Sequence, residues 1–238
     1  MPIVRLGTLL FSQPRNSSQT YAFVNTGIAS LVCALCFVVG FIMIFWIEPG
    51  IHLNPTQRLQ FILSHGRFFQ AWYFVIFVIF GSSLLVLING LEQWTKREET
   101  LTFHFATLVG FIWASYTFSC GLIAIFTIEY LLSLPAHQQS SVWYVIYAIQ
   151  MGMGDGIEWI GGVWLCIITF QMHRSQKGPR KLHYFGFLVG GIGCLTIIPR
   201  LQDAGVVFGL LQIIWFFWIA LIMTTLPKPP HVIQMKTE

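Results

Sequence analysis

Charged residues are scarce in this chain. Asp, Glu, Lys and Arg make up 9% of its 238 residues, against about 25% in a typical soluble domain. Hydrophobic residues make up 55%, and one water-soluble core of this length cannot bury so much apolar surface. The composition therefore excludes an ordinary soluble protein and predicts an integral membrane protein. A formal net charge of only +4 gives no indication of a nucleic-acid partner, so the expected partner is the lipid bilayer.

Paired extramembrane cysteines are also missing. All five cysteines lie within apolar runs, including Cys33 and Cys36 of a C-x-x-C pattern. We interpret them as small buried hydrophobic side chains, not as disulfide, redox or metal-binding residues. The first twenty residues have no small-residue cleavage site, so we expect no cleaved signal peptide.

Catalytic and cofactor motifs are missing too. The sequence has no phosphate-binding glycine loop, dinucleotide fingerprint or nucleophile elbow. Its seven histidines have none of the spacings that membrane di-metal oxygenases need. No cofactor and no metal site are evident, and the sequence favours a non-enzymatic protein.

Long apolar runs are abundant. A membrane-spanning helix needs about 20 such residues, and six runs approach or exceed this length: 26–47, 69–88, 103–130, 142–170, 182–198 and 204–225. In lipid, each segment must satisfy its own backbone hydrogen bonds, which favours helices. We therefore predict an all-α, polytopic transmembrane helical bundle of about six spans, forming a single membrane domain over 1–238.

The distribution of Lys and Arg predicts an orientation. Ten of the thirteen fall in the N-terminal arm, the second loop, the fourth loop and the C-terminal tail, whereas Arg58, Arg67 and Arg200 fall on the other side. Under the positive-inside rule both termini are cytoplasmic, in the cell inner (cytoplasmic) membrane. We expect the basic run HRSQKGPRKLH (173–183) to set topology and contact headgroups without forming a specific lipid site.

The loop between the first two runs predicts a short helix near 55–65. Asn54 suits the N-cap, Pro55 suits the first helical position, and Gln57 completes a capping box. Leu59 and Ile62 share one face of this helix. We expect it to lie on the outer membrane surface.

Two carboxylates in the fourth run are the best functional lead. Asp155 and Glu158 are three residues apart and share a helix face. Counted inward from Trp143, Glu158 lies about 22 Å deep, near the bilayer middle, where a charge costs at least about 2.5–3.5 kcal/mol. Two interpretations stay open. The pair forms a polar pocket or proton-handling site, or it is buried for packing and hydrogen-bonded to Gln150 or other side chains.

Further polar and small residues surround this lead. Glu129, Arg200 and Asp203 lie at predicted outer helix ends and are candidates for the rim of a vestibule, although capping and ion pairing explain the last two as well. Small residues let helices approach closely. We therefore predict helix-packing positions at Gly152, Gly156, Gly186 and Gly190.

The stretch from Gly152 to Trp218 contains GDGIEWIGGVWL, then KGPRKL, then FGFLVGGIGCLTIIP followed by FGLLQIIWFFWIA. This order resembles the bacterial membrane protein family catalogued as domain of unknown function 4386. Members more often have Leu-Pro-Arg where this chain has Gly178-Pro179-Arg180. The resemblance implies a six- or seven-helix bundle, and it supplies neither an activity nor catalytic residues.

Three functional hypotheses follow. The first is a non-enzymatic membrane protein, either an accessory subunit with other membrane subunits as partners or a small-ligand binder. The alternative is a proton or small-solute transporter or channel with a midplane site at Asp155 and Glu158. The third, a membrane enzyme acting on a lipid or quinone, lacks a nucleophile or metal ligands near these carboxylates.

Overall fold

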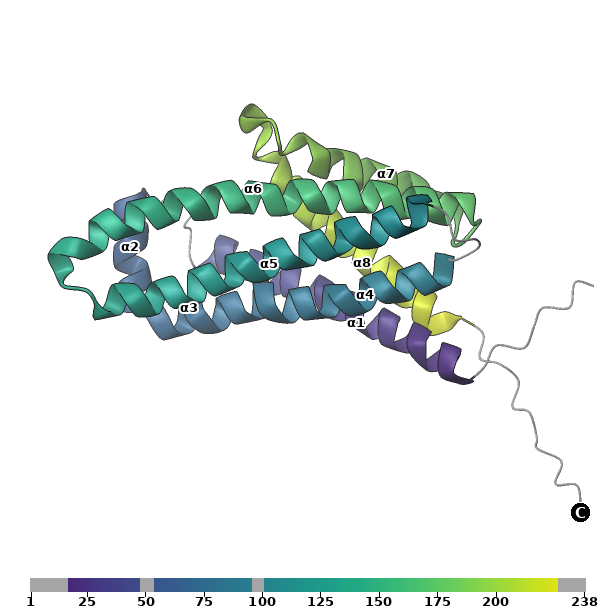
Figure 1. Ribbon diagram of the computed structural model, residues 1–238, viewed down its shortest axis with the longest axis horizontal. Helices are drawn as coiled ribbons and strands as arrows, with labels where there is room; N and C mark the ends of the chain where they lie inside the picture. The colour runs from purple at the N-terminus through teal and green to yellow at the C-terminus, as the bar shows by residue number, and fades with distance from the viewer. Residues whose placement is uncertain (1–16, 48–53, 96–100, 227–238) are drawn as a thin grey trace, which may run out of the picture.

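Every regular element in the described part of the chain is a helix, which confirms the predicted all-α fold. The computed structural model describes residues 17–47, 54–95 and 101–226 (Figure 1). The two longest helices, α5 (Leu101–Ser133) and α6 (Ala136–Arg174), run antiparallel along the molecule (Figure 1). The lengths of the helices and their apolar composition indicate that this bundle is a membrane protein.

Five helical segments are long and apolar enough to cross a membrane: Tyr21–Trp46, Gly66–Thr95, His104–Ser133, Ala136–Arg174 and Ala204–Thr225. They correspond to five of the six predicted runs. The remaining run, 182–198, corresponds to α7 (Arg180–Leu195), a helix of 16 residues, or about 24 Å. A sixth span and the orientation of the bundle stay predictions.

Two of the long helices contain π-helical turns. Helix α1 (Ser17–Ile42) continues as η1 (Met43–Ile47). Helices α3 (Gly66–Tyr73) and α4 (Phe80–Thr95) are joined by η3 (Phe74–Ile79) into one continuous helix. A π turn adds a residue to the helical turn and is frequent at functional sites. Here the two π segments come from different helices.

The short helix predicted near 55–65 is α2 (Pro55–Ser64), and its capping box is present. The Asn54 side chain accepts from the Gln57 backbone, and the Gln57 side chain accepts from the Asn54 backbone. Its apolar face does not lie on the membrane surface, because Leu59 and Ile62 are buried against the bundle. Helix α2 packs on α5 and α6.

Helices α7 and α8 (Ala204–Thr225) form a hairpin through the short 3-10 turn η4 (Pro199–Leu201). Helix α7 packs on α6, and α8 packs between α1 and α7. Helices α7 and α8 lie beside only the part of α6 nearer to Arg174 (Figure 1). Helices α5 and α6 extend further, toward α2, beyond the end of this α7–α8 hairpin (Figure 1).

The interior consists of two clusters of buried side chains. The first core cluster joins α1, α4, α5, α6, α7 and α8, and at its centre lies a closed chain of five aromatic rings. Neighbouring centroids in this chain are 5.3–6.1 Å apart, and its members are Phe80, Trp113, Trp164, Trp215 and Phe216. The second core cluster joins η1, α2, α3, α5 and α6 around Phe69, Trp72 and Trp143.

Candidate functional site

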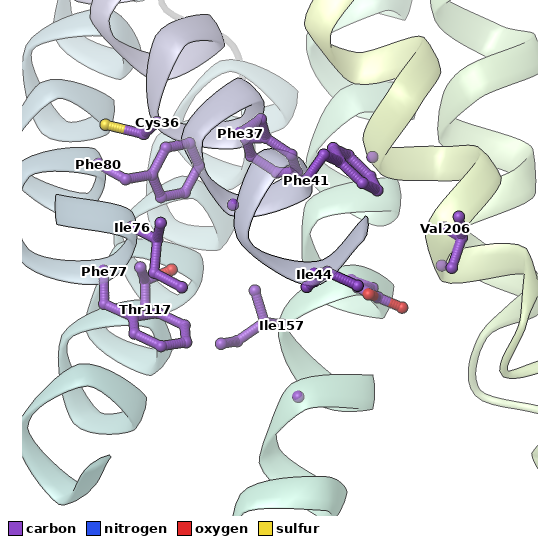
Figure 2. A pocket seen from close by; sticks show the side chains of 15 residues that line it. Cys36, Phe37, Phe41, Ile44, Ile76, Phe77, Phe80, Thr117, Ile157 and Val206 are labelled. Atoms are coloured by element: carbon purple, nitrogen blue, oxygen red, sulfur yellow. The ribbon is translucent and has the colours of Figure 1, made fainter. Parts of the chain in front are cut away.

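A cavity lies at the level where α8 begins, and we call it the Glu158 cavity. Its volume is about 260 Å³. Figure 2 shows the apolar side chains of its wall, among them Phe37, Phe41 and Phe77. Glu158 is the one charged side chain among the lining residues, which are Cys36, Phe37, Gly40, Phe41, Ile44, Ile76, Phe77, Phe80, Thr117, Gly154, Ile157, Glu158, Gly205, Val206 and Gly209.

The cavity exists because the helices around it differ in length. Helix α1 packs against α4 and α8, whereas α6 packs against α5 and α7. Along the first core cluster, α8 lies between α1 and α6, with Phe37 and Phe41 of α1 against Gly209. Helix α8 begins only at Ala204.

The Glu158 carboxyl group lies directly against the backbone of Gly205. A Cβ atom at position 205 would collide with both carboxyl oxygens unless the Glu158 side chain moved, so the glycine allows the carboxyl group to lie in this place. Gly205 belongs to the first turn of α8. The positive end of a helix dipole stabilises a nearby carboxylate, and this position therefore favours an acidic side chain.

The predicted midplane depth of Glu158 stays a prediction. The prediction counted from Trp143 as though it lay at the membrane surface, but Trp143 is 1% exposed and belongs to the second core cluster. Helix α8 has 22 residues, or about 33 Å, close to the hydrocarbon thickness of a bilayer. Glu158 lies beside its first turn. Glu158 is therefore level with one end of α8.

A second cavity adjoins the first, and we call it the Arg58 cavity. Its volume is about 240 Å³, and it is lined by Arg58, Tyr147 and Gln150 together with apolar residues. Its lining shares five residues with that of the Glu158 cavity: Gly40, Ile44, Ile76, Phe77 and Gly154. Three of the five come from η1 and η3, so the π turns supply the common wall.

Arg58 lies at the α2 end of this pair of cavities. Its guanidinium carbon is 5.9 Å from the centroid of the Tyr147 ring, a distance typical of a cation–π contact. The sequence prediction did not select Arg58 as a site residue. Its position in a polar outer loop resembled an ordinary topological charge, and no local pattern indicates that α2 folds back onto the bundle.

The other predicted polar residues are distributed over several places. Gln150 lines the Arg58 cavity. Asp155 lies in α6, and its side chain is outside the described part of the structure. Glu129 accepts a hydrogen bond of 3.3 Å from the Gln70 side chain. Arg200 lies in η4, and Asp203 takes the N-cap position of α8 without a side-chain capping bond.

The predicted vestibule stays a prediction. Glu129, Arg200 and Asp203 are absent from the residues that line the Glu158 and Arg58 cavities. The cavities are instead bounded by apolar side chains of α1, η1, η3 and α5. Those residues carried no signal in the sequence, because each belongs to a continuous apolar run that looks like any membrane span.

The predicted packing glycines fall into two groups. A Cβ at Gly186 would collide with Thr169, and one at Gly190 would lie 2.6 Å from the Cys166 sulfur, so both positions lie at the close α6–α7 contact. A Cβ at Gly156 would lie 3.2 Å from the Tyr116 ring. The prediction for Gly152 is wrong, since a Cβ there would have no other heavy atom within 4 Å.

Within the described ranges, no three His, Cys, Asp or Glu side chains gather in a group that could hold a metal ion. The polar groups that line the two cavities are the Glu158 carboxyl, the Arg58 guanidinium, the Gln150 amide, the hydroxyls of Thr117, Tyr73 and Tyr147 and two thiols, and the rest of the lining is apolar.

Comparisons with protein-family models, with curated proteins and with solved structures find no match for this chain.

Proposed function

We propose that this protein is a non-enzymatic membrane protein that binds a small, mainly apolar ligand. The ligand carries an amine or another hydrogen-bond donor that meets Glu158. The observation that supports this proposal is the Glu158 cavity, where a single carboxyl group lies among apolar side chains. Small-molecule sites are typically apolar concavities with a few polar groups and volumes of about 300–1,000 Å³. The two adjoining cavities, about 260 and 240 Å³, together fall in this range.

The few polar groups in the wall of the Glu158 cavity indicate which class of ligand it binds. Thr117 also lines the cavity, but its hydroxyl donates to the Trp113 carbonyl at 2.9 Å. That oxygen can still accept a hydrogen bond, but Glu158 is the one acidic side chain in the lining, and a carboxylate binds an ammonium group through a strong charge-assisted hydrogen bond. The apolar wall contributes affinity through removal of apolar surface from water.

The alternative, a proton or small-solute transporter, has less support. Between the Glu158 cavity and the Arg174 end, the described bundle is filled by the ring chain of the first core cluster. A role as an accessory subunit is compatible with ligand binding. Location in the inner membrane with cytoplasmic termini belongs to the same proposal, supported by the ten-to-three division of Lys and Arg.

The experiment compares Glu158→Gln with a matched control, Glu129→Gln, which removes a carboxylate outside both cavities. The full chain is purified in a mild neutral detergent. Octylamine and octan-1-ol are titrated separately, and the rise in melting temperature gives their apparent affinities. We expect Glu158→Gln to weaken octylamine binding by about tenfold or more, with octanol binding changed by less than about twofold.

Glu129→Gln should leave both affinities at the parent values. The amide keeps the size of Glu158, so the melting temperature without a probe checks that the variant is folded. A folded Glu158→Gln protein that binds octylamine as well as the parent would refute the proposal.

A further inference from the structure

The turn between α6 and α7 holds a third cavity, apart from the two described above. Its volume is about 530 Å³, and it is lined by His173, Gln176, Gly178, Arg180 and His183. Two residues of the turn have positive φ, Gln176 at 56° and Gly178 at 80°. Such left-handed positions tighten a turn. They bring the start of α7 back beside the end of α6, so residues ten positions apart meet.

Two histidines of this turn form a hydrogen-bonded pair. Their Nδ1 atoms are 3.3 Å apart, and Nε2 of His183 is 2.7 Å from the Lys177 carbonyl oxygen. A carbonyl only accepts, so His183 Nε2 carries a hydrogen, and in a neutral ring its Nδ1 is then an acceptor. His173 must therefore donate from Nδ1. This assignment leaves His173 Nε2 without a hydrogen, and it can take up a proton without breaking the pair.

The two histidines differ in exposure. His183 is 4% exposed, and its ring packs edge-on against His173 with centroids 5.3 Å apart. His173 is exposed. The buried ring thus holds the exposed ring in one tautomer and orientation, as an outer-shell partner does for a ligand-binding histidine.

The charged residues of the turn itself are of one sign. Arg174, Lys177, Arg180 and Lys181 lie within the turn, and no Asp or Glu occurs between positions 159 and 202. Of these four cations, only Arg180 lines the cavity. General headgroup contact, as expected from the sequence, needs only the net charge. It does not account for an arginine and a hydrogen-bonded histidine pair around one cavity.

We propose that this cavity binds an organic phosphate monoester. Arginine presents paired donors that match two phosphate oxygens, and His173 Nε2 accepts the proton of a phosphate hydroxyl or holds it as a donor to an oxygen. The volume exceeds that of the phosphate group alone, so an organic part enters with it. The phosphate belongs to a lipid headgroup or to a soluble metabolite. The proposal is independent of the function assigned to the Glu158 cavity.

The experiment uses the full chain and two phosphate probes. Glycerol 3-phosphate is titrated against the protein in neutral detergent, and phosphatidic acid is titrated in phosphatidylcholine vesicles that hold the protein. Melting temperature is the readout. The variants are Arg180→Ala and a matched control, Lys181→Ala, which removes the same charge from the next residue, outside the cavity lining. His173→Gln tests the histidine pair.

We expect saturable stabilisation by at least one probe. Arg180→Ala and His173→Gln should each weaken it by on the order of tenfold, whereas Lys181→Ala should change it by less than about twofold, as for a screened surface charge. Stabilisation by phosphatidic acid alone supports a lipid headgroup, and stabilisation by glycerol 3-phosphate supports a soluble ligand. Equal losses in the Arg180 and Lys181 variants would overturn the proposal, as would an unaffected His173→Gln or no saturable effect of either probe.

Discussion

The two core clusters are built differently, and their difference explains where the cavities lie. The first is made by long helices that approach closely at glycines and enclose large rings. The second contains the short helix α2, and hydrogen bonds attach α2 to α6: Trp143 donates to the Pro55 carbonyl, and Thr56 bonds Tyr144. The cavities share residues with both clusters. The cavities therefore lie where the helices of the first core cluster give way to those of the second, and side-chain packing is interrupted there.

Helix length is the physical origin of this change. Helices α5 and α6 have 33 and 39 residues, about 50 and 58 Å, well beyond the roughly 30 Å of a hydrocarbon layer. Helix α8 has 22 residues. Helix α8 begins beside the cavities, where residues of η1 and η3 form part of the lining.

The strongest way to disturb the first core cluster is to separate α6 from α7. A Cβ at position 190 would lie 2.6 Å from the Cys166 sulfur and 2.9 Å from the Gly162 carbonyl oxygen. We expect Gly190→Leu to lower the free energy of unfolding by about 3 kcal/mol or more, because overpacking forces backbone shifts. Melting temperature in detergent measures the effect.

Gly191→Leu is the matched control, since a Cβ at position 191 meets no other atom within 4 Å. It should melt at or slightly above the parent temperature, as leucine favours a helix more than glycine does. Similar melting of both variants would mean that α7 does not pack on α6 as described.

A smaller effect is expected in the second core cluster. Trp143 is almost fully buried, and its indole nitrogen donates to the Pro55 carbonyl at 2.7 Å. Trp143→Phe removes this donor and should cost about 1 kcal/mol. Because the bond holds α2, hydrogen exchange should rise at α2 and remain unchanged along α7. Faster exchange along α7 as well would show that the two clusters do not behave separately.

The sequence predicted much of the fold because local signals determine it. The last helix has the predicted bounds, and the capping residues around Asn54 locate α2. The site was less predictable. A π turn inside FVIFVI has the same apolar pattern as an α turn, so the role of Ile76 and Phe77 was invisible. The position of Glu158 beside the first turn of α8 is a property of the assembled bundle.

The most direct test of the account fills the cavities without removing Glu158. Gly154 lines both cavities, and a Cβ there meets no other atom within 4 Å. Gly154→Leu therefore occupies the space that a ligand needs without a backbone collision. Gly152→Leu is the matched control, because position 152 is equally open and is absent from both linings.

The measurement is the rise in melting temperature caused by octylamine in the two variants. We expect Gly154→Leu to melt at least as high as the parent without octylamine and to be no longer stabilised by it, while Gly152→Leu responds like the parent. Octylamine stabilisation that survives in Gly154→Leu, or that is lost equally in both variants, would contradict the assignment of the Glu158 cavity as a ligand site.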